Sequence, residues 1–426
     1  MPPFTEKESS MTASGRSYWR VVPLLMGLTF MGHFNRVAIS VAGTERIMGQ
    51  YHITPTQMGV VYSAFLLMYT VFMTPAGAFA DRFGPWLALG LMAFGLAAGA
   101  VGTGVVGLTV GAAGIVTALL IVRSVMGALS SPLHPSTART ISNWIPSERR
   151  GLANGITLGA ALVGVASSYY LVGALMDRFG WPVAFIVIGA VTALVGALWL
   201  MLAGDTPSAR HAAPPIASSD GGWLSLLRKR DLWLVTLGYT ALDYFEYLFF
   251  YWMQYYFDSV LNVGTDTSRL YATIIALAMA AGMISGGWVT DRLVQRLGLR
   301  AGRAAVPVVG MIGGAVFLVV GVMAKDPMWV MIWFSVGVFA ATSAEAASWM
   351  TAVELGGARG TTAAAMLNTG GNIGGVIAPI LTPFVGTTLG WPWAVALGAA
   401  ISLSGAIFWL FVKPAPPAPQ AQLAAA

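Results

Sequence analysis

The sequence contains no cysteine, and only 9% of its 426 residues are charged. The lack of cysteine excludes disulfide frameworks and thiolate metal sites. A soluble domain carries about 25% charged residues, so the low charge and the 57% share of hydrophobic residues indicate a chain that crosses a membrane many times. The four histidines (His33, His52, His134 and His211) are too scattered to suggest a metal cluster. We expect neither a metal nor a cofactor.

Enzyme motifs are also missing. The chain has no Gly-x-Ser-x-Gly elbow, no His-Glu-x-x-His and no phosphate-binding Gly-Lys-Ser/Thr loop. These absences argue against a hydrolase and against a pump with its own nucleotide site. The net charge of +6 reflects membrane topology here and does not indicate a nucleic-acid partner.

Apolar runs of membrane-spanning length fill most of the chain. A helix needs about 20 mostly apolar residues to cross the hydrocarbon, and this length predicts an all-α polytopic membrane protein with twelve spans in two six-helix halves. The expected spans are Tyr18–Ala42, Gln57–Ala80, Trp86–Val106, Leu108–Leu133, Leu152–Leu175, Pro182–Ala203, Leu232–Tyr256, Leu270–Thr290, Ala304–Ala324, Trp329–Thr351, Thr361–Val385 and Trp391–Val412.

The polar segments divide the chain. One long polar connection, rich in proline and serine and basic at its end, separates the sixth and seventh spans, and the tail is rich in proline and alanine. The predicted parts are an N-terminal tail (1–17), an N-terminal bundle (18–203), a linker (204–230), a C-terminal bundle (231–412) and a disordered tail (413–426).

Lysine and arginine predict the orientation. Of the 23 such residues, two lie within spans and four (Arg46, Arg178, Arg269 and Lys325) on one side, so 17 lie on the other, with both termini and the linker. Cytoplasmic loops carry the excess of basic residues. We therefore expect a cytoplasmic-membrane protein with both termini and the linker in the cytoplasm.

Two motifs repeat at one offset. Gly77-x-x-x-Asp81-Arg82 recurs as Gly287-x-x-x-Asp291-Arg292, and Gly180-Trp181-Pro182 recurs as Gly390-Trp391-Pro392, both 210 residues later. A shared offset in matching positions indicates an internal repeat. Two parallel repeats around a midplane site are typical of secondary transporters.

Two arginines lie within spans. His33, Arg36 and Ser40 share one helix face by their spacing, and Arg123 lies in the fourth span. A guanidinium suits a carboxylate or phosphate group because its planar fork offers two parallel donors. The alternative is that each arginine pairs with a buried carboxylate and only joins helices.

Acids occupy the matching place in the second half. At the offset of 210, His33 corresponds to Asp243 and Arg36 to Glu246. Two close carboxylates favour the binding of a proton, as proton coupling requires, and Glu345 is a further candidate among small residues. The alternatives are static ion pairs with the arginines or a position at the wet end of the helix.

The eleventh span and the seventh supply further candidates. Asn368 and Asn372 stand one turn apart, and an amide can both donate to and accept from a hydroxyl-rich ligand. We expect the neighbouring glycines to serve close helix packing. Tyr251 is a candidate stacking or gating residue, in an aromatic cluster (Tyr244 to Tyr256) that we otherwise expect to face lipid.

These residues resemble a known family. The loop beginning at Gly77 is similar to the signature of the major facilitator superfamily, and several blocks resemble its anion:cation symporter branch of hexuronate, galactonate, glucarate and tartrate carriers. The residues that carry the second resemblance are Phe65, Tyr69, Arg123, Gly127, Pro135, Trp144, Pro146, Arg149, Arg150, Gly151, Gly180, Trp181, Asn372, Gly374, Gly375 and Pro379.

The resemblance implies a substrate site and also shows departures. It implies that Arg36 and Arg123 contact the substrate carboxylate or its coupling partner, and that Tyr69 and Asn372 line the site. The branch usually has tyrosine and an acid where this chain has His33 and Asn35. It also usually has glutamate at Ser130 and glutamine at Met73.

We therefore predict a secondary transporter that moves a sugar acid or similar carboxylate by alternating access. Asp243 and Glu246 are the predicted proton carriers, and the Asp81-Arg82 and Asp291-Arg292 loops are predicted to stabilise a state closed on the cytoplasmic side. The replaced acids leave three readings open: a proton site elsewhere (Asp243, Glu246, Glu345 or His33), an uncoupled facilitator or exchanger, or coupling to another ion. An efflux carrier for apolar compounds and a membrane sensor are further alternatives. We expect a monomer with a small-molecule substrate, protons and lipid as its partners.

Overall fold

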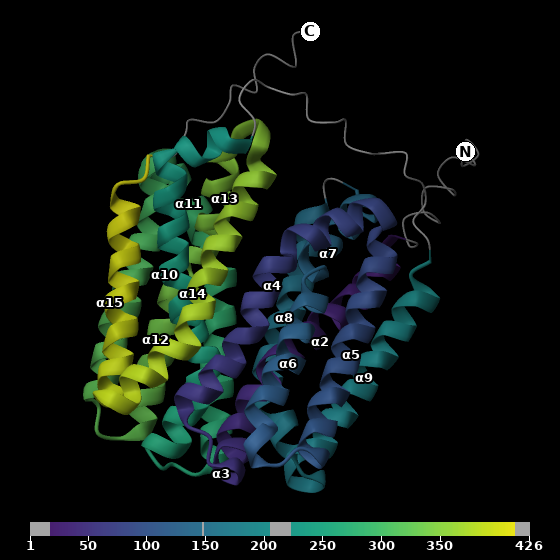
Figure 1. The fold of residues 1–426 in the computed structure, drawn as a ribbon. Coiled ribbons are helices and arrows are strands. Elements are labelled where there is room, and N and C mark those ends of the chain that lie inside the picture. Colours follow the sequence, from purple (N-terminus) through teal and green to yellow (C-terminus); the bar gives the residue numbers. More distant parts are fainter. Residues whose placement is uncertain (1–17, 147–148, 205–222, 414–426) are drawn as a thin grey trace, which may run out of the picture. The chain divides into compact units, whose positions relative to one another are not determined.

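A computed structural model describes residues 18–146, 149–204 and 223–413. In this part of the chain every regular element is a helix (Figure 1), as predicted. The predicted N-terminal tail, most of the linker and the C-terminal tail beyond Lys413 lie outside the described residues.

Helices of the N-terminal half alternate with short turns. Their bounds are η1 Tyr18–Arg20, α2 Val21–Ala42, η2 Gly43–Ile47, α3 Met48–Tyr51, α4 Pro55–Phe83, α5 Pro85–Thr109, α6 Ala112–Ser130, α7 Leu133–Trp144, α8 Arg150–Phe179 and α9 Trp181–Leu202.

The C-terminal half repeats this order, with the single bent helix α11 where the N-terminal half has α4 and α5. Its elements are η5 Trp223–Arg228, α10 Arg230–Tyr255, η6 Tyr256–Val260, α11 Thr265–Met323, α12 Pro327–Thr342, α13 Ala344–Gly356, η7 Gly357–Arg359, α14 Gly360–Thr388 and α15 Trp391–Leu410. The predicted tenth span is divided at Ser343, and the predicted fourth span ends near the turn at Ser131, after which α7 follows.

Within the described residues, ten helical stretches are long and apolar enough to cross a membrane, judged by length and composition only. One of them, the 59-residue α11, is interrupted at Gly298, whose φ of 80° is not helical. The 26-residue α10 is long enough but more polar, since it carries Asp243 and Glu246. Dividing α11 and adding α10 gives the twelve spans that we predicted, so that number depends on these two helices.

The chain forms two compact units. Unit 1 contains residues 1–42 and 68–213, and unit 2 contains residues 43–67 and 214–426. The predicted halves differ from these units in one segment, Gly43–Leu67, which groups with unit 2. There Ser63 donates to the carbonyl of Val376 at 2.7 Å, and Gly59 leaves room for the carbonyl of Pro379.

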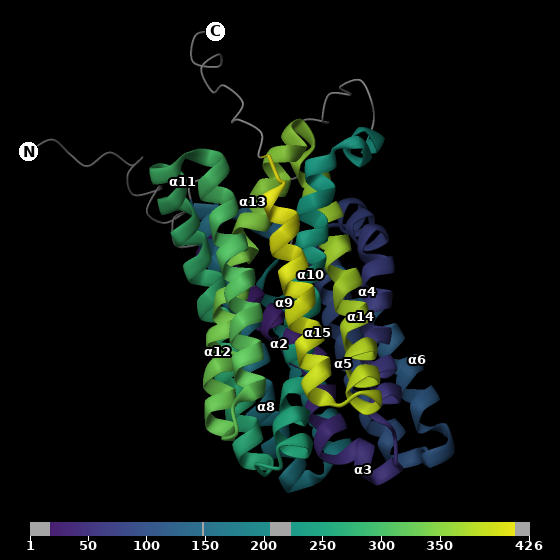
Figure 2. The same cartoon turned by 90° about the vertical axis from the view of Figure 1, so that its left-hand side faces the viewer.

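Each unit contains the same helix pairs. In unit 1, α2 packs along α8 and α5 along α9; in unit 2, α10 packs along α14 and α11 along α15. Figures 1 and 2 both place α10 beside α14. These pairs join corresponding helices of the two repeats, which supports the internal repeat that the motifs indicated.

Glycine allows the closest of these contacts. A Cβ at Gly164 of α8 would overlap the backbone of Phe30 in α2, and a Cβ at Gly374 of α14 would overlap the carbonyl of Thr240 in α10. Both residues of the second pair lie 210 positions after those of the first. The expectation that the glycines of α14 serve helix packing therefore agrees with the structure.

The two Gly-Trp-Pro motifs begin equivalent helices. Gly180 and Gly390 adopt φ of 76° and 103° directly before α9 and α15. A side chain disfavours this conformation, and proline suits the first helical turn because its missing N–H needs no partner there. The repeated sequence thus forms a repeated turn.

The prediction that the aromatic cluster of α10 faces lipid is wrong. From Ala241 to Gln254 every residue of α10 is buried, including Tyr244, Tyr251 and Trp252. The reason is that α14, α15, α13 and α11 all pack against α10. Hydropathy could not reveal this, because aromatic side chains serve equally in a membrane interface and in a protein core.

The glycine contact between α14 and α10 can be tested by substitution. We expect Gly374→Val to lower the melting temperature of the detergent-purified protein, because overpacking costs about 1–3 kcal/mol. Gly155→Val is the matched control, since a Cβ at Gly155 meets nothing within 4 Å. Equal melting temperatures for the two variants would contradict the proposed close contact.

Candidate functional site

Arg123 is bonded to the backbone of α2. Its Nη1 donates to the carbonyl of Asn35 at 3.3 Å, and its Nη2 donates to the carbonyl of Arg36 at 3.1 Å. The side chain is 1% exposed. Arg123 therefore fixes the turn of α2 that carries Arg36, whereas its predicted contact with substrate remains a prediction.

Arg36 lies over an aromatic ring. Its guanidinium carbon is 4.8 Å from the centre of the Tyr69 ring, a distance at which the ring face attracts a cation. The predicted site residues Arg36 and Tyr69 are thus brought together within unit 1.

His33 lies near Arg36 together with a histidine that we had not assigned to the site. The His33 and His134 rings are 5.3 Å apart, edge to face, and the charge of Arg36 reaches both. Nδ1 of His33 contacts the carbonyl of Thr29 at 3.1 Å. A carbonyl only accepts, so Nδ1 carries the proton and Nε2 of a neutral ring is an acceptor.

Asn35 and Ser130, the two neutral residues at positions where the resembled branch usually has acids, are hydrogen-bonded to residues of unit 1. Asn35 donates to the carbonyl of Met31 at 2.8 Å and to the hydroxyl of Thr192 at 3.0 Å. Ser130 donates to the carbonyl of Met126. Where the resembled branch usually has acids, this chain therefore has side chains that join or stabilise helices of unit 1.

The described interior of unit 1 has a positive charge balance. Arg36 and Arg123 are buried, and the acids of the described part are Asp81 and Asp177, near the ends of α4 and α8. Both are exposed, and Asp81 bonds Arg139 at 2.9 Å. This interior is thus chemically suited to an anion.

Unit 2 contains a cluster of buried acids. Asp243 and Glu246 lie in the middle of α10 and are 7% and 5% exposed, so the alternative of a wet helix end is excluded. The carboxylates of Asp243 and Glu345 lie close enough to Glu246 for their charges to act on it. All three predicted proton-coupling residues are therefore brought together.

Tyr239 and Trp349 complete this cluster and were missed at the level of sequence. Tyr239 donates its hydroxyl to Oε1 of Glu345 at 2.8 Å, and the indole of Trp349 donates to the same oxygen at 2.9 Å. Tyr239 precedes Asp243 by one helical turn, and this spacing could have placed it on the same helix face as Asp243 from the sequence alone. Nothing in the sequence linked Trp349 to α10.

The remaining predicted ligands lie in two places of unit 2. Asn372 donates to the carbonyl of Asn368 one turn earlier, which confirms that they share a face. Tyr251 is stacked between Tyr62 and Tyr247, with ring centres 4.9 Å and 6.0 Å away. Tyr251 thus belongs to an aromatic stack, and whether it contacts substrate remains a prediction.

The repeated acidic motifs are helical. Asp81 and Arg82 lie in the last turn of α4, whereas Asp291 and Arg292 lie inside α11, so the prediction of a loop there is wrong. Gly287 approaches Ala346 of α13, while nothing lies within 4 Å of a Cβ at Gly77. Arg292 stacks on Trp288 at 4.6 Å. Their gating role remains a prediction.

A buried ion pair holds the segment 43–67 in unit 2. Glu45 accepts from Nε and Nη2 of Arg269 at 2.8 and 2.6 Å, and from Gln254 at 2.6 Å. Arg269, which we had counted as a loop residue, lies within α11. Sequence reasoning missed this pair because 224 residues separate its members.

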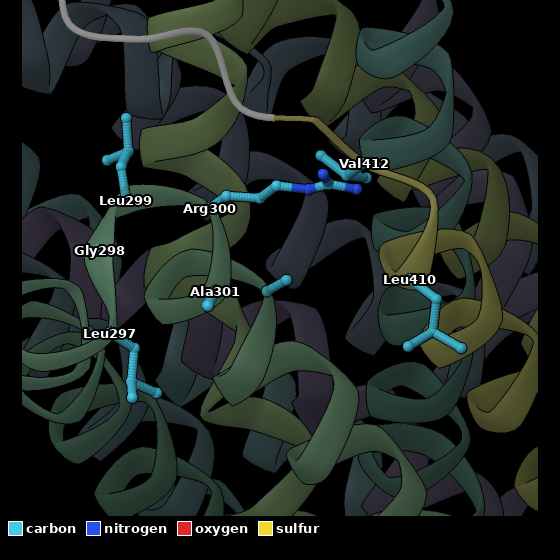
Figure 3. A pocket seen from close by; sticks show the side chains of 8 residues that line it. Leu297, Gly298, Leu299, Arg300, Ala301, Leu410 and Val412 are labelled. Carbon is cyan, nitrogen blue, oxygen red and sulfur yellow. The ribbon is translucent and has the colours of Figure 1, made fainter.

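One shallow pocket lies away from these residues. It has a volume of about 430 Å³ and is lined by residues near the bend of α11 and the end of α15. Figure 3 shows the Arg300 side chain reaching across it toward Val412. None of the predicted substrate ligands lines it, so it is not part of the candidate site.

The fold and the charged interiors define a polytopic membrane protein of the transporter class. The sequence model of the Major Facilitator Superfamily matches residues 25–302 and 293–426. The chain therefore belongs to this superfamily, and it is a transporter and not an enzyme, as predicted.

Relatives named as anion carriers match most of the chain. A probable sulfoacetate transporter of Cupriavidus necator is 28% identical over 90% of this chain and 91% of its own length. A probable L-galactonate transporter of Escherichia coli is 27% identical over 91% of this chain and 88% of its own. The predicted resemblance to the anion-carrying branch is thus confirmed.

A solved structure supports the fold. A bacterial homologue of the human lysosomal transporter Spinster has a TM-score of 0.76 and is 16% identical, with 93% of this chain and 96% of that chain covered. At this identity the comparison concerns the fold alone.

The buried pair gives a test of stability. We expect Glu45→Gln to cost about 3–5 kcal/mol, because it leaves the charge of a buried arginine without its buried counterion. Asp266→Asn is the control, since Asp266 contacts the same arginine from a side chain that is 89% exposed. Thermal unfolding of both variants checks this, and a control as unstable as Glu45→Gln would contradict it.

Proposed function

We propose that this protein is a secondary transporter that moves a small organic anion, a sugar acid or a similar carboxylate, across the cytoplasmic membrane by alternating access. The observation that carries the proposal is the positive interior of unit 1. There Arg36 lies over Tyr69, while the acids of the described unit lie exposed near helix ends. A charge within a membrane-spanning helix is costly and usually functional.

The relatives narrow the chemical class. Their names concern sulfoacetate and L-galactonate, which share an acidic group and a small polar body. A guanidinium recognises either acid group through paired hydrogen bonds. Arg36 is accordingly the proposed anion ligand, with Tyr69 orienting it and Arg123 fixing the turn of α2 beneath it.

Histidine and amide side chains suit the rest of such a substrate. Neutral His33 offers Nε2 as an acceptor, and Asn368 and Asn372 offer amides that donate and accept. These residues are the proposed ligands for hydroxyl groups. Tyr251, a member of the aromatic stack, is a further proposed ligand.

The proposed coupling ion is the proton, carried by the acids of unit 2. Asp243 and Glu246 are buried, Glu345 is half-buried, and the charges of Glu345 and Asp243 act on Glu246. Three like charges at low dielectric favour protonation of at least one. Both termini are proposed to lie in the cytoplasm, on the evidence of the loop charges.

An uncoupled exchanger is the second candidate, and one observation favours it. Asn35 and Ser130 are neutral and bonded within unit 1, so this unit lacks acids at the positions where the resembled branch usually has them. An exchanger would carry substrate against substrate without any response to a pH gradient.

A thermal-shift screen tests the anion site. Purified protein is heated with hexuronates, aldonates, aldarates, sulfoacetate, short carboxylates and neutral sugars, beside Arg36→Gln and Arg36→Lys. A ligand that binds only the folded state raises the melting temperature. We expect one class of acids to stabilise the wild type, a weaker effect in Arg36→Lys and none in Arg36→Gln.

The contrary result of this screen is equally clear. Stabilisation by neutral or apolar ligands, unchanged in Arg36→Gln, would make Arg36 a structural residue and favour an efflux carrier.

Coupling is tested in proteoliposomes with the acid that gives the largest stabilisation. We expect Glu246→Gln to abolish accumulation driven by a pH gradient, because a neutral amide cannot carry the proton. It should retain counterflow, in which the substrate exchanges without net proton movement. Asp326→Asn is the control, since this acid caps α12 and asparagine caps equally well.

Accumulation that persists in Asp243→Asn, in Glu246→Gln and in Glu345→Gln would refute the proton assignment. If the wild type itself shows counterflow but no response to a pH gradient, the exchanger is the correct function.

A further inference from the structure

The three acids of unit 2 have different hydrogen-bond environments. Oε1 of Glu345 accepts from the Tyr239 hydroxyl and from the Trp349 indole. The indole also lies 3.1 Å from the Tyr239 oxygen, so the two donors support each other. Donors that point at a carboxylate favour its charged form.

Oε2 of Glu345 is buried without a partner in the described structure, so its two donors both act on Oε1; Glu246 lacks such donors. Its Oε1 is buried and has no hydrogen-bond partner in the described structure. A buried carboxylate oxygen without a donor is strongly disfavoured as an anion, whereas the neutral acid is tolerated. Glu246 lies near the charges of Glu345 and Asp243, which oppose a further negative charge.

The titratable groups of the other helices packed against α10 are few. Besides Glu345, α13 carries Glu354, which pairs with Arg303. Helices α12, α14 and α15 contain no ionisable side chain, and α14 presents Gly371 to Asp243 and Tyr239. The ionisable residues of α11 lie toward its first turns and toward its bend, from Asp266 to Tyr271 and from Asp291 to Arg303. The groups that act on Glu246 are thus Asp243, Tyr239 and Glu345.

We propose that Tyr239 and Trp349 are positioning residues that hold Glu345 as the charged member of the cluster, so that Glu246 is the carboxyl that takes up and releases the coupled proton. This inference rests on the proposed proton coupling. One proton binds Oε1 of Glu246 on one side of the membrane and leaves the same oxygen on the other. Glu345 stays ionised and raises the energy of a second charge beside it.

Infrared difference spectroscopy of the full-length purified protein tests this assignment without a substrate. A protonated carboxyl gives a C=O stretching band that an ionised carboxylate lacks. We expect a pH titration of the wild type to show such a band from a buried acid. Glu246→Gln removes this band, whereas Glu345→Gln retains it.

The positioning residues are tested by the same titration. Tyr239→Phe removes one donor from Glu345, so Glu345 begins to protonate as well, and the titration midpoint moves to higher pH by about one unit. Trp349→Phe removes the other donor while it keeps an aromatic ring, and we expect a change in the same direction. Tyr244→Phe is the control, since the Tyr244 hydroxyl contacts Thr382 instead.

Four results decide the matter. A band that survives Glu246→Gln and disappears in Glu345→Gln overturns the assignment, and so does a midpoint that neither Tyr239→Phe nor Trp349→Phe moves. If Tyr239→Phe does not fold, Trp349→Phe alone tests the same oxygen. If the bands behave as expected but Glu246→Gln retains pH-driven accumulation, the proposed coupling fails while the charge assignment stands.

Discussion

Charge buried among apolar helices is the constraint on which the rest of this structure depends. Removing an ion from water costs several kcal/mol unless partners replace the lost hydration. The described part of the chain supplies such partners in different ways. Arg123 donates to two carbonyls of α2, Arg36 lies on the Tyr69 ring, and Arg269 pairs with Glu45. Arg303 pairs with Glu354 in the same manner.

The acids of unit 2 differ in how many hydrogen-bond donors they receive. Glu345 receives two donors, whereas Oε1 of Glu246 has none within the described residues. In a static scaffold such an oxygen would only lower the stability of the fold, because a buried acceptor without a donor loses its hydration. In a carrier whose working cycle protonates and deprotonates it, the missing donor is an advantage, because a strong hydrogen bond would hold the group in one state.

The scaffold around these charges is built twice from the same parts. The Gly164 and Gly374 contacts, the Gly-Trp-Pro turns and the helix pairs recur in both units. What differs is the chemistry at equivalent positions, since the turn of α2 carries Arg36 where α10 carries Glu246. The repeated backbone thus supports a positive interior in one unit and a negative interior in the other.

The sequence by itself determined the class of protein, most helices and the repeat, because hydropathy and spacing are local properties that a membrane enforces strongly. It also identified Arg36, Glu246 and Glu345, since an ionisable residue in an apolar span is conspicuous. It did not predict that α10 is buried or that Asp291 lies inside a helix. Those outcomes depend on how neighbouring helices pack.

Only the tertiary structure decided which partners the charges have. Tyr239 meets Trp349 across 110 residues, and Arg269 meets Glu45 across 224. No periodicity connects positions so far apart. Hydrogen bonds over such separations form only after the helices have packed, and they distinguish acids that look alike in the sequence.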